Sequence, residues 1–280
     1  MKVGLVLEGG AMRGMYTCGV LDVFLENNIE VDCAIGVSAG ALFGVNYCSK
    51  QKGRVLRYQK KYIKDKNYMG IRSLLKTGNI VNCQFAYHDI PRKYDLFDEK
   101  EYSKSKTKFY AVVTNVKTGN PEYIQITNTE KQIKYLEATG AMPFVSKMVE
   151  IGNEKYLDGA LGDSIPLEKM QEMGYDKIIV ILTKPYGYKK TKQPEILAKK
   201  YYKDYPNLVE AINTRYLKYN NTTDIVNELE KKKEIFVFRP SKVVKMGRIE
   251  KDIRKIQEMY DLGVEDAKNL LKDLQEYLKK

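Results

Sequence analysis

Short apolar runs alternate with helix-like patterns through the first part of the chain. The run at residues 3–7 predicts a buried strand, and a glycine-rich turn at 9–14 leads into a helical pattern that continues to about Glu26. A second apolar run at 31–35 passes through another small-residue turn into a helix that ends near Cys48. This repeated order of strand, turn and helix is typical of a parallel sheet with helices packed on its faces. The pattern therefore predicts an α/β fold.

Further elements follow in the middle of the chain. A basic helix is expected over 54–76 and another near 131–139, and a hairpin with Gly152-Asn153 at its turn is expected over 148–157. The remaining apolar runs predict strands at 109–114, 123–126, 177–183 and 234–238.

Beyond Pro240 the pattern becomes helical. Two apolar stripes, one from Ile249 to Tyr260 and one from Ala267 to Leu278, flank Gly263. Because glycine weakens a helix interior, we expect a break at Gly263 and hence a C-terminal helical hairpin. We therefore expect a catalytic α/β domain at 1–240, with C-terminal helices at 241–280 packed on the same core.

Composition narrows the class of protein. The chain has 280 residues, 43% hydrophobic and 30% charged, which suits one large folded α/β unit. It contains no apolar run of spanning length, and Glu8 and Arg13 interrupt the first residues where a signal peptide would be apolar. Its four cysteines form no C-x-x-C pair, so we expect free thiols and a cytoplasmic location.

The formal net charge of +12 is concentrated in two stretches. Residues 50–76 carry ten basic side chains against one acidic, residues 184–203 carry seven against one, and both contain several tyrosines. Such stretches fit an anionic membrane surface or a nucleic acid, since both present dense phosphate, and they also fit an ordinary solvated surface.

The clearest chemical motif is Gly36-Val37-Ser38-Ala39-Gly40, between a predicted strand and a helix. A G-x-S-x-G sequence in that position is typical of a nucleophile elbow, where a tight turn projects the serine hydroxyl above the sheet edge. A purely structural turn or a phosphate-binding turn is the alternative interpretation. The motif makes Ser38 the candidate nucleophile.

A second glycine-rich turn, Gly9-Gly10-Ala11-Met12-Arg13-Gly14, follows the first strand. Backbone N–H groups in such a turn are suited to stabilise the oxyanion of an attacked ester. The alternative is a nucleotide phosphate loop, but Ala11 interrupts the spaced glycines and neither turn ends in Gly-Lys-Ser/Thr.

A serine nucleophile needs a base. Nothing in the sequence around the single histidine, His88, resembles a partner in a catalytic triad. We therefore expect His88 to be a surface or loop residue. Asp158 ends an apolar strand and precedes Gly159, which would allow a neighbouring chain or the substrate to approach; Asp163 is the competing carboxylate. Burial and a hydrogen bond to the serine would make Asp158 a workable base.

Together these motifs resemble the patatin-like phospholipase family, most closely its bacterial branch. The G-G-x-x-R-G turn, the G-x-S-x-G elbow and the later D-G-A at 158–160 occur in the family's order. The resemblance extends through residues 114–119, 138–143 and 260–263, and so covers essentially the whole chain.

The resemblance implies a three-layer α/β/α fold and hydrolysis of fatty-acyl esters of phospholipids or related lipids, with no metal, cofactor or nucleic acid. It implies a dyad in which Ser38 is the nucleophile and Asp158 the base. Ala11 stands where the family more often has a third glycine, and a positive φ there would reshape the turn. A transacylase with the same dyad, a non-catalytic lipid-binding protein and a nucleotide-binding protein remain alternatives. In this interpretation the oxyanion donors belong to Gly9, Gly10, Ala11 and Arg13, and the supporting motif glycines are Gly14, Gly36, Gly40 and Gly159.

Overall fold

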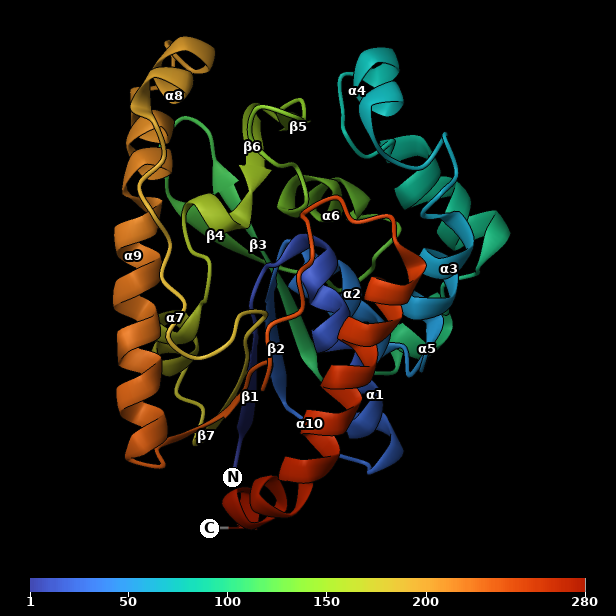
Figure 1. The fold of residues 1–280 in the computed structure, drawn as a ribbon, viewed down its shortest axis with the longest axis vertical. Helices are drawn as coiled ribbons and strands as arrows, with labels where there is room; N and C mark the ends of the chain where they lie inside the picture. The colour runs from blue at the N-terminus through green and yellow to red at the C-terminus, as the bar shows by residue number, and fades with distance from the viewer. Residues whose placement is uncertain (280) are drawn as a thin grey trace.

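Five apolar runs form the parallel part of one eight-stranded sheet in the computed structural model, which describes residues 1–279. The strand order across the sheet is β5-β6-β3-β2-β1-β7-β8. The parallel strands run side by side through the centre of the molecule, and their carboxyl ends point to the end that carries α4 and α8 (Figure 1). Their bounds are β1 Val3–Leu7, β2 Cys33–Val37, β3 Lys108–Asn115, β7 Lys177–Ile181 and β8 Ile235–Phe238.

The other edge of the sheet is antiparallel. Both β4 (Pro121–Gln125) and β6 (Glu154–Asp158) pair with β3, and β5 (Val149–Ile151) pairs with β6 as the predicted hairpin. The register sets Val113 opposite Asp158. This pairing brings the end of β6 to the carboxyl end of the parallel strands.

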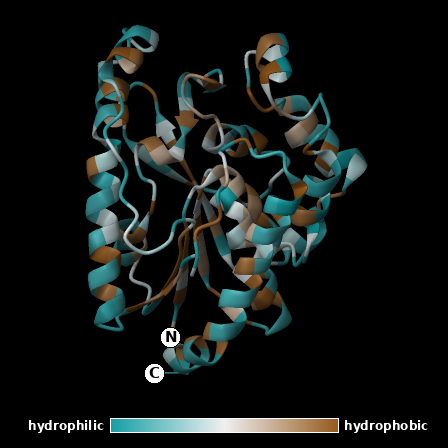
Figure 2. Cartoon of the chain, viewed as in Figure 1, coloured by the Kyte–Doolittle hydropathy of each residue, from teal (hydrophilic) through white to brown (hydrophobic). Residues whose placement is uncertain are grey.

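Helices cover both faces of the sheet, as expected for three layers (Figure 1). Alternate residues of β1 face opposite sides, so Leu5 and Leu7 belong to one core cluster and Val6 to the other. Figure 2 shows the strands as hydrophobic and the outer helices as largely hydrophilic on their exposed sides. The first cluster includes residues of α1 (Met15–Glu26), α2 (Ala39–Cys48) and α10 (Ile253–Lys279), and the second includes residues of α7 (Leu167–Glu172) and α9 (Pro206–Lys231).

The basic stretch predicted as one helix over 54–76 forms two helices. A turn around Asp65 separates them, and Gly70, with φ of 124°, has a backbone conformation that no helix permits. The two are α3 (Arg54–Tyr62) and α4 (Ile71–Thr77). The other helical segments are η1 (Ala11–Gly14), the wide-turned η2 (Gln84–Tyr94), α5 (Glu99–Ser103), α6 (Ile133–Thr139), η3 (Gly159–Leu161) and α8 (Glu195–Tyr201).

The predicted C-terminal hairpin is wrong, because α10 runs without a break through Gly263. A side chain at Gly263 would lie 2.1 Å from the carbonyl oxygen of Tyr16, and one at Gly19 would lie 2.2 Å from that of Tyr260. These two glycines therefore mark a close crossing of α1 and α10. The division into 1–240 and 241–280 stays a prediction.

Two other boundaries differ from the pattern. The strand expected at 31–35 is β2 at 33–37, and the Asp32 side chain just before it accepts a hydrogen bond from the Val3 backbone N–H. The helix α9 was not predicted at all. Within residues 1–279, no helix combines the length and the apolar character needed to cross a bilayer.

Candidate active site

The sharp turn between β2 and α2 places Ser38 at the end of the sheet. Ser38 has φ of 53° and ψ of −122°, a strained conformation for a residue with a side chain. A side chain at Gly40 would lie 2.4 Å from the Leu7 carbonyl oxygen, so glycine is required for α2 to begin this close to β1. The turn thus has the geometry expected of a nucleophile elbow.

The Ser38 hydroxyl donates a hydrogen bond to Asp158, with 2.7 Å between Oγ and Oδ2. Asp158 is the last residue of β6, and its other oxygen, Oδ1, accepts from the Ala160 N–H at 2.9 Å. Both side chains are buried. The sheet pairing therefore brings together the two residues that the sequence predicted as nucleophile and base.

Burial raises the pKa of Asp158 above its ordinary value. The positive charge of Arg215, the Ala160 N–H and the Ser38 hydroxyl each act in the opposite direction. The net upward direction makes this carboxylate a stronger base than an exposed aspartate, while the opposing contacts favour its ionised form.

Thr139 fixes the backbone of the nucleophile, and the sequence did not single it out. Its Oγ1 accepts from the Ser38 N–H at 2.9 Å and donates to the Val112 carbonyl at 2.6 Å. The side chain is fully buried at the end of α6. Thr139 thereby connects the elbow to β3. It lies within residues 138–143, over which the chain resembles the family, but the resemblance does not indicate this role.

The Gly9–Gly14 turn lies beside the elbow. A side chain at Gly9 would lie 2.9 Å from the Val37 carbonyl oxygen. Within residues 1–279, the N–H groups of Gly9, Gly10 and Ala11 have no acceptor, whereas the Arg13 N–H donates to the Gly10 carbonyl at 3.1 Å. Ala11 has φ of 49°, so the residue that departs from the family pattern is in a left-handed conformation.

Glu8 fixes the start of this turn and was also not predicted. Its carboxylate accepts from the Thr183 N–H at 2.5 Å, from the Thr183 hydroxyl at 3.0 Å and from the Tyr219 hydroxyl at 2.8 Å. Glu8 is only 2% exposed, and its hydrogen bonds connect the end of β1 to the segment after β7 and to α9.

The two alternative bases, His88 and Asp163, contact residues other than Ser38. The Nε2 of His88 is 3.1 Å from Oε1 of Glu137, and His88 lies partly buried on η2 instead of on a surface loop. Asp163 accepts from the Tyr123 hydroxyl at 2.8 Å and from the Ile165 N–H at 3.1 Å. Neither side chain has a hydrogen bond to Ser38.

The remaining motif glycines lie where backbone segments approach closely. A side chain at Gly159 would lie 2.1 Å from the Val112 carbonyl oxygen, which agrees with the expectation that another chain approaches this position. Gly36 lies against the start of α2, and Gly14 lies against Ala39 and Phe43.

A largely apolar pocket extends from Ser38 between α2, α3 and η2. Its volume is about 1080 Å³, part of it open to solvent. Apolar side chains of several elements line it, among them Leu42, Phe43, Tyr58, Met69, Ile90 and Leu136. An apolar pocket that begins at a serine hydroxyl is suited to hold an acyl chain.

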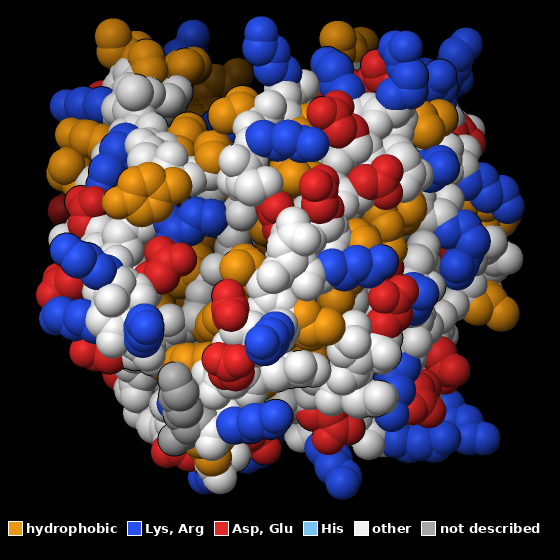
Figure 3. All heavy atoms as spheres, turned by 60° about the horizontal axis from the view of Figure 1, so that its bottom comes forward, with side chains coloured by type: hydrophobic (Ala, Val, Ile, Leu, Met, Phe, Trp, Pro, Cys, Tyr) orange, Lys and Arg blue, Asp and Glu red, His pale blue; other side chains and the backbone are white. Residues whose placement is uncertain are grey.

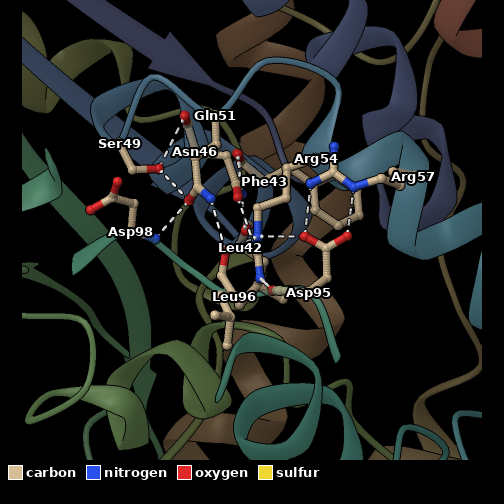
Figure 4. Close-up of polar contacts among 10 residues, drawn as sticks. All are labelled: Leu42, Phe43, Asn46, Ser49, Gln51, Arg54, Arg57, Asp95, Leu96 and Asp98. Atoms are coloured by element: carbon tan, nitrogen blue, oxygen red, sulfur yellow. Dashed lines mark hydrogen bonds and ion pairs between the residues drawn. The ribbon is translucent and has the colours of Figure 1, made fainter. Parts of the chain in front are cut away.

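Asn46 on α2 and Arg54 on α3 also line this pocket, and Figure 4 shows their polar contacts. The Arg54 guanidinium donates to Oδ1 of Asn46 at 2.8 Å and to the Leu96 carbonyl at 3.2 Å, and lies 3.3 Å from Asp95. Arg57 binds the same Asp95 carboxylate through two contacts of 2.8 Å. These bonds satisfy the charge of Arg54, which is 4% exposed.

Known proteins resemble this chain over most of its length. It is 25% identical over 274 residues to "Uncharacterized protein YjjU" of Escherichia coli K12, covering 94% of this chain and 75% of that protein. It is 25% identical over 181 residues to "Lysophospholipase nte1" of Aspergillus fumigatus and 23% identical over 182 residues to "Neuropathy target esterase sws" of Drosophila melanogaster. Each of these two matches covers 64% of this chain but only 12% and 13% of the respective relative.

Among solved structures, VipD from Legionella pneumophila matches with a TM-score of 0.49 and 13% identity, covering 97% of this chain and 67% of that one. A family model described as a domain of unknown function, DUF6363, matches residues 205–279. The model described as Patatin-like phospholipase matches residues 5–170, which include β1, the elbow and Asp158. Because that match covers more than half of the chain, the protein belongs to the patatin-like phospholipase family.

Proposed function

We propose that the protein is a serine acyl hydrolase that cleaves fatty-acyl esters of phospholipids or related lipids. The observation that carries the proposal is the 2.7 Å contact between Ser38 Oγ and Asp158 Oδ2 at the start of an apolar pocket. Membership of the patatin-like family and the names of the lysophospholipase relatives support a lipid ester as substrate.

In the first half of the proposed reaction, Ser38 Oγ attacks the ester carbonyl carbon while its proton moves to Asp158 Oδ2. The carbonyl oxygen becomes negative and accepts hydrogen bonds from the unpaired N–H groups of the Gly9–Ala11 backbone. The bond to the alcohol oxygen then breaks, and Asp158 returns the proton to the departing alcohol. The product is an acyl-enzyme whose chain occupies the apolar pocket.

In the second half, water attacks the acyl carbon and gives a proton to Asp158. The bond to Ser38 Oγ breaks, the proton returns to Ser38, and a fatty acid leaves. The raised pKa of Asp158 supports its assignment as the base in both halves, because its burial and its contact with Ser38 favour proton transfer without a histidine.

Labelling with a fluorophosphonate probe tests the nucleophile, and hydrolysis of a monoacyl ester tests the dyad. We expect Ser38→Ala to abolish labelling and hydrolysis, and Asp158→Asn to reduce hydrolysis by at least about 100-fold. Asp163→Asn and His88→Ala serve as controls, because their side chains are bonded elsewhere, and they should retain activity. Loss of activity in the His88 variant with full activity of Asp158→Asn would contradict the dyad.

We also propose that an anionic membrane surface contacts the end of the molecule that carries α4 and α8. Both short helices expose aliphatic side chains there: Ile71 is 74% exposed, Leu75 83% and Ile196 77%. Basic side chains flank them on the same helices, at Arg72, Lys76 and Lys200, whereas Lys199 pairs with Glu195 of its own helix. Exposed apolar side chains bordered by cations are typical of interfacial binding.

The two basic stretches contribute to this surface only in part. Within residues 50–76, Lys52 pairs with Glu26 and Arg57 with Asp95, so their charges are compensated inside the protein. Figure 3 shows the opposite end of the molecule, where basic and acidic side chains are mixed. The proposed membrane surface therefore rests on the apolar side chains of α4 and α8 and the cations beside them.

A further inference from the structure

Basic side chains from four separate segments gather beside the Ser38–Asp158 pair. Lys190 Nζ and Arg215 Nε lie 3.3 Å and 3.4 Å from the same atom, Oγ of Ser164. Ser164 Oγ donates to the Ala160 carbonyl at 2.8 Å, and the Ala160 N–H donates to Asp158 at 2.9 Å, so this contact links both cations to the segment that holds the base. The cluster consists of Arg13 on η1, Lys184 and Lys190 between β7 and α8, Arg215 on α9, and Arg248 between β8 and α10.

The basic side chains of this cluster outnumber the carboxylates near them. Within residues 1–279, no Asp or Glu oxygen lies within ion-pair distance of any of its five members. Glu8 and Asp158 are the carboxylates that attract these cations, and two negative charges do not balance five basic side chains. Unpaired charges that are partly buried are costly, so such a cluster is suited to receive an anion.

Burial and a neighbouring cation both disfavour the charged form of Lys190. Its ammonium lies 3.5 Å from the ring centre of Tyr219, and the residue is only partly exposed. Burial and the neighbouring Arg215 lower the pKa of Lys190 to about 6. A bound anion would reverse that effect, because it would stabilise the protonated form.

The reaction geometry assigns a side of the site to each part of the substrate. The acyl chain occupies the apolar pocket along α2, α3 and η2. The alcohol lies next to Asp158, since Asp158 must protonate it as it leaves. A negative group attached to that alcohol would therefore lie beside Lys190 and Arg215.

We propose that Lys190 and Arg215 form a subsite for a phosphate group carried by the alcohol part of the substrate. This inference rests on the proposed acyl hydrolase function and narrows its substrate to esters with an anionic phosphate next to the scissile bond. Arginine and lysine together suit phosphate, because several donors meet several acceptor oxygens.

The test compares two esters with the same acyl chain: a monoacylglycerol, and a monoacylglycerol 3-phosphate. The measured quantity is the ratio of their kcat/KM values, because a loss common to both substrates leaves the ratio unchanged. We expect Lys190→Met and Arg215→Gln each to lower the preference for the phosphate ester by about tenfold or more. Lys189→Met is the matched control, since Lys189 pairs with Asp224 on the surface, and it should leave the ratio unchanged. An unchanged ratio in both test variants would overturn the subsite.

A binding experiment separates this inference from the hydrolase function. Glycerol 3-phosphate should raise the Tm of the Ser38→Ala protein, and the rise should disappear when Lys190→Met and Arg215→Gln are added. If neither ester is hydrolysed but this shift occurs, the hydrolase function fails and the anion site stands. If inorganic phosphate gives the shift while the two esters keep the same ratio in all variants, the site binds free phosphate and the headgroup assignment is overturned.

Discussion

The Thr139 hydroxyl connects the Ser38 N–H to the Val112 carbonyl, with contacts of 2.9 Å and 2.6 Å. Through this one side chain the strained elbow is anchored to β3, the strand that also pairs with the strand of Asp158. The orientation of the nucleophile and the position of its partner thus depend on the same part of the sheet.

Thr139→Val should therefore disturb both stability and catalysis. Valine has nearly the same shape but leaves the Ser38 N–H and the Val112 carbonyl buried without partners, so we expect a loss of about 2–4 kcal/mol in the free energy of unfolding. We also expect kcat to fall while KM for a monoacyl ester changes little. Thr139→Ser keeps the hydroxyl and is the control. Equal stability and equal kcat in the two variants would show that the hydroxyl does not anchor the elbow.

The raised pKa of Asp158 predicts the pH dependence of hydrolysis. The reaction needs the ionised carboxylate, so kcat/KM should fall as the pH decreases through the pKa of the free enzyme. Because that pKa is raised, the fall should occur above about pH 4, the range of an ordinary aspartate.

Arg215→Gln should move this acidic fall to higher pH, because Arg215 lowers the pKa of Asp158. A neutral monoacylglycerol is the appropriate substrate, since it has no phosphate to bind the cationic cluster. Lys218→Gln, an exposed cation on the same helix, is the control. An acidic limb that does not move in the Arg215 variant would contradict the electrostatic contact.

The positive φ of Ala11 predicts that glycine is preferred there. A left-handed conformation costs an ordinary residue about 1–2 kcal/mol, and the extra flexibility of glycine in the unfolded chain offsets part of the gain. We expect Ala11→Gly to stabilise the protein by about 0.5–1 kcal/mol without loss of hydrolysis. In denaturant titrations, the control Ala211→Gly in the interior of α9 should instead destabilise by about 1 kcal/mol. If Ala11→Gly were less stable than the unchanged protein, the left-handed conformation of Ala11 would not be a source of strain.

Gly263→Ala should destabilise the protein, although alanine normally favours a helix by about 1 kcal/mol over glycine. The new methyl group would lie 2.1 Å from the Tyr16 carbonyl oxygen, so α10 must move away from α1. Thermal unfolding measures the effect, and we expect a loss of about 2 kcal/mol or more. An increase in Tm would mean that the helices separate at little cost.

The same glycine shows where sequence reasoning fails. Glycine weakens a helix and also permits two helices to touch, and the sequence alone does not distinguish these uses. The pattern around Gly263 was therefore interpreted as a break, whereas the partner that explains it, α1, lies more than 200 residues earlier. A contact between segments that are far apart in the sequence cannot be inferred from the residues next to either one.

The residues of the candidate site likewise fall into two groups, those that the local sequence predicts and those that it does not. Ser38 and the glycines around it could be predicted because the elbow is built from adjacent residues, and Asp158 because its strand end and the following glycine are local features. Thr139, Lys190 and Arg215 reach the site only through the packing of α6, of the segment after β7 and of α9. Their roles depend on neighbours that no spacing in the sequence reveals.

The exposed apolar side chains of α4 and α8 predict how the protein binds vesicles. Replacing Ile71 and Leu75, or Ile196 and Leu197, by glutamate removes apolar area and adds charge that an anionic bilayer repels. We expect each double variant to reduce binding to anionic vesicles by about tenfold or more in a flotation assay, and high salt to weaken binding of the unchanged protein.

Hydrolysis of a monomeric soluble ester should stay unchanged, because the replaced side chains are on α4 and α8, whereas Ser38 and Asp158 are on other elements. Leu217→Glu with Ile225→Glu is the matched control, since both residues are exposed but lie on α9 instead of on α4 or α8. Vesicle binding that is insensitive to salt and equal in the α4, α8 and α9 variants would contradict the proposed membrane surface.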